Sequence, residues 1–289
     1  MKRKTTHNNL PVVEYTPDSS LRNPLAMFKS MWKDLLSSKE LALRLMSRDI
    51  KAQYRQSIFG ILWAFIPPVA TAFVFIVLNQ RQIFNIRTTD IPYPVFVMFG
   101  TVLWAIFVES LNAPIQTVAA SHVLLTKITF PKEALILSGI GKVVFNAGIK
   151  LLIIFGLFVY YRIPISWGLL FALLSIVLLI LLGTTIGLAL TPLSVLYQDI
   201  IQMLTVVTGL WFFITPVVYP PPVNFPFTLL SVINPVSPIL IGIRDMATEG
   251  TLNNPIPFFS VSALMLIGLL ITWVVFRLSI PILVERISS

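Results

Sequence analysis

The sequence of 289 residues has no cysteine and few charged residues. The absence of cysteine excludes disulfides and thiolate chemistry. Charged residues make up 11% of the chain and hydrophobic residues 56%, and the mean hydropathy is +0.86. A water-soluble domain needs a larger polar share at its surface, so this composition predicts an integral membrane protein.

The N-terminus lacks the apolar stretch of a cleavable secretory signal, although it begins with basic residues, MKRKTTHNN. Eleven of the 21 Lys and Arg residues fall in the first 55 residues, with five acids. This basic excess flanks the first apolar segment, so we interpret it as a topology signal and expect no nucleic-acid partner. Residues 1–36 are expected to form a cytoplasmic N-terminal tail.

Charge-poor segments predict an all-α polytopic protein with six transmembrane helices, since about 20 apolar residues cross a bilayer core of roughly 30 Å. The segments cover about residues 56–80, 91–118, 134–160, 167–191, 200–215 and 258–276. We expect Pro192 to end the fourth. Cations gather near both termini and at the loop holding Lys127 and Lys132, which predicts that both termini are cytoplasmic.

Residues 216–243 do not fit a seventh helix, because they hold seven prolines. We expect a broken, re-entrant exit segment there, followed by a loop around Asp245 and Glu249. Irregular backbone is tolerated at membrane depth only where protein or a water-filled cavity covers it.

Residues 37–56 predict an amphipathic interface helix, with Ser37 and Glu40 spaced as a capping box. One helical face would carry Leu43, Met46, Ile50 and Tyr54, and another Arg44, Arg48, Lys51 and Arg55. Such a helix lies with its apolar face in the acyl boundary and its cations among headgroups. A solvated helix flanking a membrane span is the alternative. Pro67 and Pro68 are expected to bend the first span directly behind it, without a spacer.

Four stretches together resemble ABC-2 type permeases that export lipid-linked polysaccharides. They are RDIKAQYRQSIFGILWAFIPP at 48–68, LLTKITFPKEALIL at 124–137, YQDIIQMLTVVTGLWFFITPVVYP at 197–220 and NPVSPILIGIRDMATEG at 234–250. The resemblance implies the membrane subunit of an ATP-driven exporter in the bacterial inner membrane, with residues 57–289 as its transmembrane domain. It implies a homodimer, two copies of a separate ATPase that binds ATP and Mg, and a glycan on a lipid carrier, with O-antigen, capsule or teichoic acid as the cargo.

The resemblance also implies that the loop 121–134, around Lys127, Phe130 and Pro131, is a coupling helix that fits a cleft on the ATPase. The amphipathic helix, with Arg48 and Arg55, would touch the ATPase as well. Physically, Phe130 can act as an apolar anchor within a charged rim that includes Lys132. A plain cytoplasmic turn is the alternative.

The chain shows no energy source or catalytic centre of its own. SGIGKVV at 138–144 lacks the G-x-x-x-x-G-K spacing and lies within a predicted span. His7 and His122 are not placed beside an obvious ligand set. We therefore predict a transporter subunit rather than an enzyme, with no catalytic residue, cofactor or metal in this chain.

Three charges fall inside predicted spans: Glu109, Lys142 and Lys150. A charge in a bilayer needs a partner or costs several kcal/mol. Glu109 and Lys150 are expected at depths about 6 Å apart, which predicts that they pair, while Lys142 reaches toward the cytoplasmic surface. Alternatively, the lysines meet the substrate's pyrophosphate.

A glycan channel needs aromatic faces, since sugar C–H surfaces stack on rings. The candidates are Tyr54, Trp63, Phe65, Trp104, Phe107, Trp211, Phe212 and Tyr219. Interfacial anchoring is the alternative role for such residues. Gly183 and Gly187 allow close helix approach, which we expect within one subunit.

Other transporter and enzyme classes fit less well. An ion-coupled carrier would show an inverted repeat and an acid near the helix break, and neither is visible. An intramembrane enzyme would need paired carboxylates or a metal site, and a passive channel would need a charge ring or filter loop.

Overall fold

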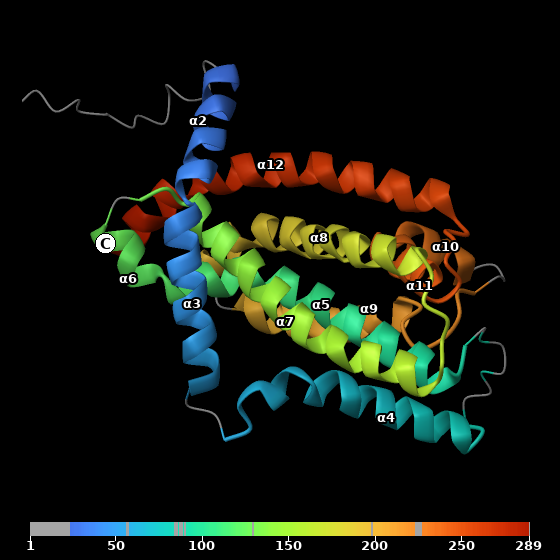
Figure 1. Ribbon diagram of the computed structural model, residues 1–289. Coiled ribbons are helices and arrows are strands. Elements are labelled where there is room, and N and C mark those ends of the chain that lie inside the picture. The colour runs from blue at the N-terminus through green and yellow to red at the C-terminus, as the bar shows by residue number, and fades with distance from the viewer. Residues whose placement is uncertain are drawn as a thin grey trace, which may run out of the picture.

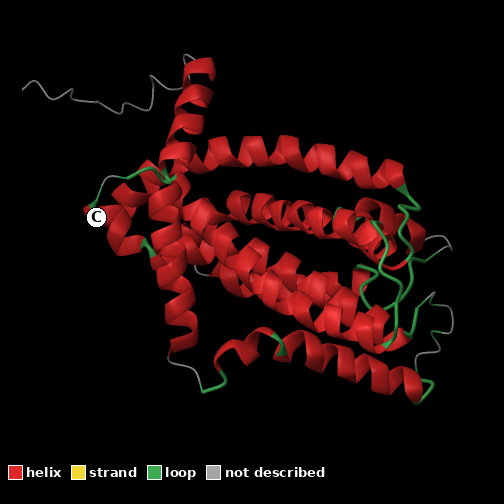
Figure 2. Ribbon diagram, in the orientation of Figure 1, coloured by secondary structure: helices red, strands yellow, loops and turns green. Residues whose placement is uncertain are grey.

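A computed structural model describes residues 24–55, 58–83, 86, 89, 91–128, 130–197, 199–222 and 227–288, and these contain helices and loops but no strand (Figure 2). The helices are α2 (Pro24–Ser37), α3 (Lys39–Arg55), the 3-10 helix η1 (Gly60–Ala64), α4 (Ile66–Gln80), α5 (Tyr93–Ala120), α6 (His122–Lys127), α7 (Glu133–Tyr160), α8 (Gly168–Leu196), α9 (Asp199–Ile214), α10 (Phe227–Ile233), α11 (Val236–Thr248) and α12 (Pro255–Ser288). The protein is therefore all-α in its described part, as predicted.

Helix α5 lies at the centre of the bundle, packed against α4, α7 and α8, and α12 covers the other side of α8 (Figure 1). Helices α2 and α3 cross one end of the bundle, which also holds α6, and α10 and α11 lie at the opposite end. We call these the α3 end and the α11 end. The long apolar helices thus form the middle of the molecule, and shorter helices lie across both of its ends.

Small residues bring α5 and α8 together. A Cβ atom at Gly183 would overlap Ser110 and the carbonyl of Phe107, and one at Gly187 would overlap the carbonyl of Leu111. Because these contacts lie within one chain, the prediction that the G-x-x-x-G pair packs inside the subunit is confirmed.

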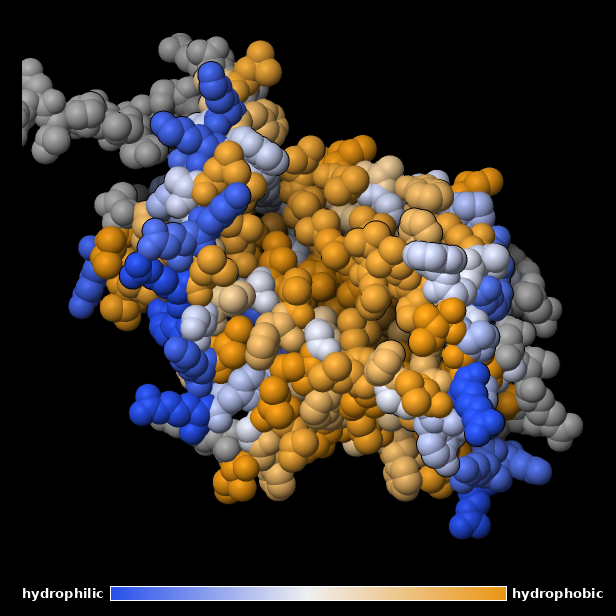
Figure 3. Space-filling view, in the orientation of Figure 1, coloured by the Kyte–Doolittle hydropathy of each residue, from blue (hydrophilic) through white to orange (hydrophobic). Residues whose placement is uncertain are grey.

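Among the described residues, four helices are long and apolar enough to cross a membrane: α5, α7, α8 and the Pro255–Pro281 part of α12. Helices α4 and α9 are apolar but have only 15 and 16 residues. Hydrophobic side chains cover the middle of the molecule, and hydrophilic ones gather at its two ends (Figure 3). The chain is thus a multi-pass membrane protein, and six crossings stay a prediction.

Two proline positions differ from expectation. Helix α8 continues through Pro192 to Leu196, so the prediction that Pro192 ends the span is wrong. A membrane helix tolerates proline where neighbouring groups satisfy the freed carbonyl. Pro67 and Pro68 lie in the first turn of α4, where the amides lack helical acceptors in any case. They begin a helix instead of bending one, and η1 separates α4 from α3.

The capping box expected at residue 37 is also absent. The Ser37 hydroxyl donates to the carbonyl of Asp34, 3.0 Å away, at the end of α2, while Glu40 pairs with Arg44.

Two other segments also differ from the prediction. Asp245, expected in a loop, lies within α11. The predicted N-terminal tail contains α2, which was not anticipated, and its residues 1–23 lie outside the described part.

Candidate substrate groove and coupling surface

A groove of about 600 Å³ runs between α3, η1, α4, α5, α7 and α9. Its polar lining consists of Gln53, Thr71, Thr101, Glu109, Asn146, Lys150, Thr205 and Thr208. Its aromatic lining consists of Trp63, Phe75, Trp104, Phe212 and Phe213. A surface of this mixed kind can offer rings to apolar faces of a ligand and hydrogen-bonding groups to its hydroxyls.

A network of polar side chains forms one wall of the groove. Glu109 of α5 accepts hydrogen bonds from Asn146 and Lys150 of α7, and Lys150 forms an ion pair with it. The Tyr54 hydroxyl of α3 donates to the Asn146 side-chain carbonyl at 2.8 Å. Burial raises the pKa of Tyr54, and the charge of Glu109 raises it further. The predicted Glu109–Lys150 pair is therefore present, and it is linked to α3.

Rings from α5 and α9 form a cluster behind the groove. Trp104 packs against Phe107 and Phe212 at centroid distances of 5.2 and 5.9 Å, and Phe107 against Trp211 at 5.4 Å. The Trp211 indole donates to the Asn234 side chain at 3.0 Å, just before α11. This cluster connects the groove to the α11 end.

The predicted aromatic residues occupy different positions relative to the groove. Trp63 is 52% exposed and lines it, whereas Trp104 and Phe212 also line it but are buried. Phe107 is fully buried and supports the rings in front of it. Phe65 is half-buried at the start of α4, and the Tyr219 hydroxyl donates to the Phe213 carbonyl at 2.8 Å.

Sequence reasoning missed Phe213, which lines the groove and is 62% exposed. It follows Phe212 directly, so the two rings leave α9 in different directions and meet edge to face. Only the helix packing decides which of two adjacent rings faces the opening.

A second pocket, of about 380 Å³, lies between α3, α5 and α7. Lys142, Asp49 and Gln116 line it, and it shares Gln53 and Glu109 with the groove. Arg48 pairs with Asp49, and Lys150 with Glu109. Lys142 makes none of the ion pairs found among the described residues. The ammonium of Lys142 is therefore the one cation lining this pocket that has no carboxylate partner among those residues.

Arg244 fixes the chain that follows α9. Its guanidinium donates to the carbonyls of Pro216 and Val217, at 3.2 and 2.7 Å, and lies 3.8 Å from the centre of the Phe96 ring. A Cβ atom at Gly100 would overlap the Val217 carbonyl. The residues after α9 are thus held against α5 by a buried arginine, which was not singled out from the sequence.

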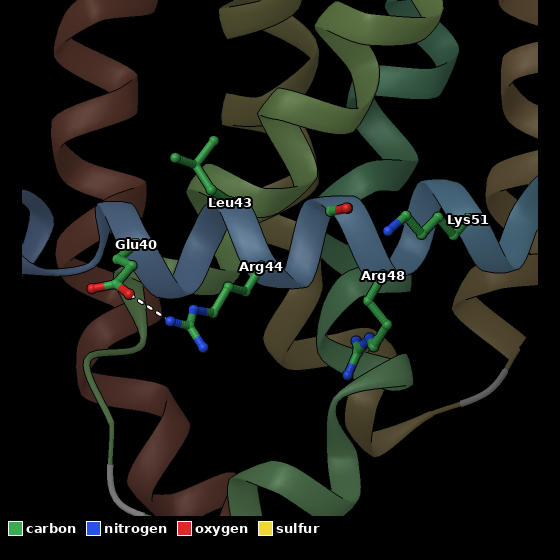
Figure 4. Close-up of a pocket in the computed structure, with 6 residues that line it drawn as sticks. Glu40, Leu43, Arg44, Arg48 and Lys51 are labelled. Carbon is green, nitrogen blue, oxygen red and sulfur yellow. Dashed lines mark hydrogen bonds and ion pairs between the residues drawn. The ribbon is translucent and has the colours of Figure 1, made fainter.

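The exposed cations of α3 form part of a shallow hollow at the α3 end. Arg44 and Arg48 point to one side of the helix and Leu43 to the opposite side (Figure 4). Arg44 pairs with Glu40 at 2.7 Å. Arg48 and Arg55 are exposed, while Ala42 and Leu45 face the bundle and are buried. The cationic face is therefore free to contact another molecule.

The predicted coupling loop contains the short helix α6. Phe130 is half-buried, packs against the inner hydrophobic residues around Leu135 and Phe276, and lies 4.4 Å below the Lys132 ammonium. Burial lowers the pKa of Lys132, and Glu133 opposes that change. Pro131 is half-buried and Lys127 is exposed.

The exposed apolar side chains of this loop are Val123 and Ile128, at 61% and 56%. They, rather than Phe130, are available as anchors for a partner. The run VLLTKI at 123–128 holds four apolar residues, and its sequence does not show which of them face outward.

Known proteins with similar sequences decide the family. Residues 40–247 match the model of the ABC-2 type transporter family. The chain belongs to the ABC-2 type transporter family. This ABC-2 protein is 30% identical to the O-antigen export system permease protein RfbA of Myxococcus xanthus over 193 residues, which is 65% of this chain and 71% of the relative.

Two permeases of the same name from Klebsiella pneumoniae are 26% and 25% identical over 243 residues, covering 81% of this chain and 88% of each relative. The chain is therefore a permease subunit of the ABC-2 type. Among the described residues, no three His, Cys, Asp or Glu side chains gather as a metal site would require.

Proposed function

We propose that this chain is the transmembrane subunit of an ATP-driven exporter that moves lipid-linked O-antigen from the cytoplasmic to the outer side of the bacterial inner membrane. Two copies would form the channel and work with two copies of a separate ATPase, which binds ATP and Mg. The names of the three relatives support O-antigen as the cargo. Both termini would be cytoplasmic, with α3 as an interface helix.

The observation that carries the proposal is the groove lined by both rings and polar groups. Trp63 of η1 and Phe213 of α9 present exposed faces, and Thr205 is an exposed hydroxyl on the α9 side of the groove. Sugars stack their C–H faces on rings and hydrogen-bond through their hydroxyls, so this lining suits a glycan better than an acyl chain or a bare ion.

The exposed side of α9 supports a dimer. Met203, Val206 and Leu210 recur at helical spacing and are each more than 60% exposed beside the groove. A second copy placed against α4 and α9 would bury this row and close the groove into a channel. Lipid would otherwise cover these side chains.

Lys142 is a better candidate than Lys150 for contact with an anionic substrate headgroup. Lys150 is held by Glu109, whereas Lys142 lines the second pocket without an ion-pair partner among the described residues. Because both pockets share Gln53 and Glu109, a headgroup at Lys142 would lie next to a glycan entering the groove.

The test is deletion of this gene in its host, followed by comparison of glycan on intact cells with glycan in lysed cells. We expect glycan to accumulate inside and disappear from the surface. Surface glycan should return with the wild-type gene, and fail to return when the ATPase of the host's exporter is inactivated. Unchanged surface O-antigen with loss of capsule or teichoic acid would reassign the cargo within the family. Export that continues without ATPase activity would overturn an ATP-driven mechanism.

A further inference from the structure

Helix α2 carries a row of large apolar side chains that are between 43% and 86% exposed in the described structure. Leu25, Phe28, Trp32 and Leu36 recur at steps of three and four, so they lie on one face of the helix. Leu25 is 86% exposed and Trp32 is 60% exposed. We call these four side chains the α2 strip. An unpartnered apolar face of this kind marks an interaction surface.

The opposite side of α2 is fixed to the bundle, which sets the direction of the strip. Arg277 of α12 donates to Asp34 at 2.6 Å and to Ser30 at 2.9 Å, and also bonds Glu133 of α7 at 2.7 Å. Met31 is fully buried beside them. The strip therefore faces away from the protein because of specific contacts.

The surroundings of α2 identify what covers the strip. The helix projects beyond α12 at the α3 end of the bundle (Figure 1), where hydrophilic side chains replace the hydrophobic ones of the middle (Figure 3). The hydrophobic side chains of α2 lie on its right in Figure 3, on the side where that hydrophobic middle lies, and hydrophilic ones lie on its left. The strip is therefore close to the apolar surface that lipid covers.

Charge agrees with a lipid partner. Lys29 and Lys33 are exposed and lie one helical step beside the strip, so their ammonium groups would meet phosphate headgroups while the strip enters the acyl boundary. We propose that α2 is a membrane-surface helix whose strip is covered by lipid, anchored to the bundle through Arg277. This contact would extend the interface helix proposed for α3 by about 21 Å, from the 14 residues of α2.

Since the chain has no cysteine, single cysteines can be placed without removing others. The test uses Phe28→Cys and Trp32→Cys on the strip, with Lys33→Cys and Ser37→Cys as matched positions on the polar side. Each variant is spin-labelled in the full-length protein in phosphatidylcholine and phosphatidylglycerol vesicles. Collision with oxygen, which concentrates in lipid, is compared with collision with a water-soluble nickel chelate.

We expect oxygen to reach positions 28 and 32 several-fold more than the chelate does, and the reverse at positions 33 and 37. Equal chelate access at all four positions would show a helix in water and overturn the proposal. Protection of positions 28 and 32 from both reagents would show that protein covers the strip, either another protein, a second copy of this chain or residues 1–23. That result would also overturn the proposal of a lipid-covered strip. The readout needs no glycan or ATPase, so it is independent of the proposed cargo.

Discussion

The carboxylate of Glu109 in α5 forms an ion pair with the ammonium of Lys150 in α7, inside the apolar part of the molecule. The side chain of Lys150 is only 7% exposed. A charge at this depth needs its partner in order to remain ionised at low cost. The pair therefore joins two long helices, and through Asn146 and Tyr54 it joins them to α3.

Removing one member of the pair should cost more than removing both. Lys150→Met leaves Glu109 without its cation, and we expect a loss of about 3 kcal/mol of stability. The double variant Lys150→Met with Glu109→Gln should recover at least half of that loss. Thermal unfolding in detergent measures both. Additive losses in the double variant would show that the two groups do not act as a pair.

Export measurements on the same variants separate pairing from substrate binding. If the pair is structural, Glu109→Gln and Lys150→Met should reduce surface glycan to a similar extent. Loss of export with Lys150→Met alone, at unchanged stability, would favour direct contact between Lys150 and the substrate.

Two aromatic positions should give opposite phenotypes. Trp63→Ala removes a half-exposed ring from the groove, so we expect export to fall severalfold while stability changes by about 1 kcal/mol or less. Phe107→Ala empties a fully buried site and should cost about 3–5 kcal/mol. Surface-glycan labelling and thermal unfolding, made on the same preparations, distinguish the two. Equal effects on stability would contradict the placement of Trp63 at the groove surface.

A single methyl group should disturb the α11 end. Gly100→Ala places a Cβ against the Val217 carbonyl and the Arg244 guanidinium, so we expect a loss of about 1–3 kcal/mol. Gly148→Ala is the matched control, because it is also helical and its Cβ meets nothing within 4 Å. That control should be neutral or gain up to about 1 kcal/mol in unfolding measurements. A stable Gly100→Ala protein would show that the segment after α9 is held less tightly than the structure indicates.

Ile128 should matter more than Phe130 for coupling. Ile128→Asp places a charge in the exposed apolar part of the loop, and we expect binding of the partner ATPase to weaken about tenfold or more. Thr126→Asp adds the same charge at an exposed polar position and should change binding little. Phe130→Asp should instead lower the thermal stability of the chain, because Phe130 packs inward. Titrating the ATPase against each purified variant measures its binding affinity and so ranks the three positions.

Charge and hydropathy predicted much of the helical pattern. Glu133 and Asp199 begin α7 and α9 within one residue of expectation, because a charge marks where an apolar helix leaves the bilayer. Prolines were harder to interpret, since their effect depends on the neighbours. Pro192 lies within α8, and Pro67 and Pro68 lie in the first turn of α4.

The candidate site was predictable only where depth along a helix was enough. Glu109 and Lys150 could be paired from their positions along two antiparallel spans. The direction of a ring could not be obtained in the same way, because Phe107 and Phe213 differ only in which neighbours surround them. Arg244 is the first charged residue after a long uncharged run. Its isolation in an apolar segment could have predicted that it has a hydrogen-bond partner, although not that the partner is the Val217 carbonyl.

Two of the helices that line the groove, α4 and α9, are short. With 15 and 16 residues, α4 and α9 rise by about 22–24 Å, whereas the hydrocarbon of a bilayer is about 30 Å thick. A hydrophobic mismatch of this size is relieved by local thinning of the bilayer. The membrane would be thinnest beside the groove, and a polar headgroup passing there would cross the shortest apolar distance that the protein offers.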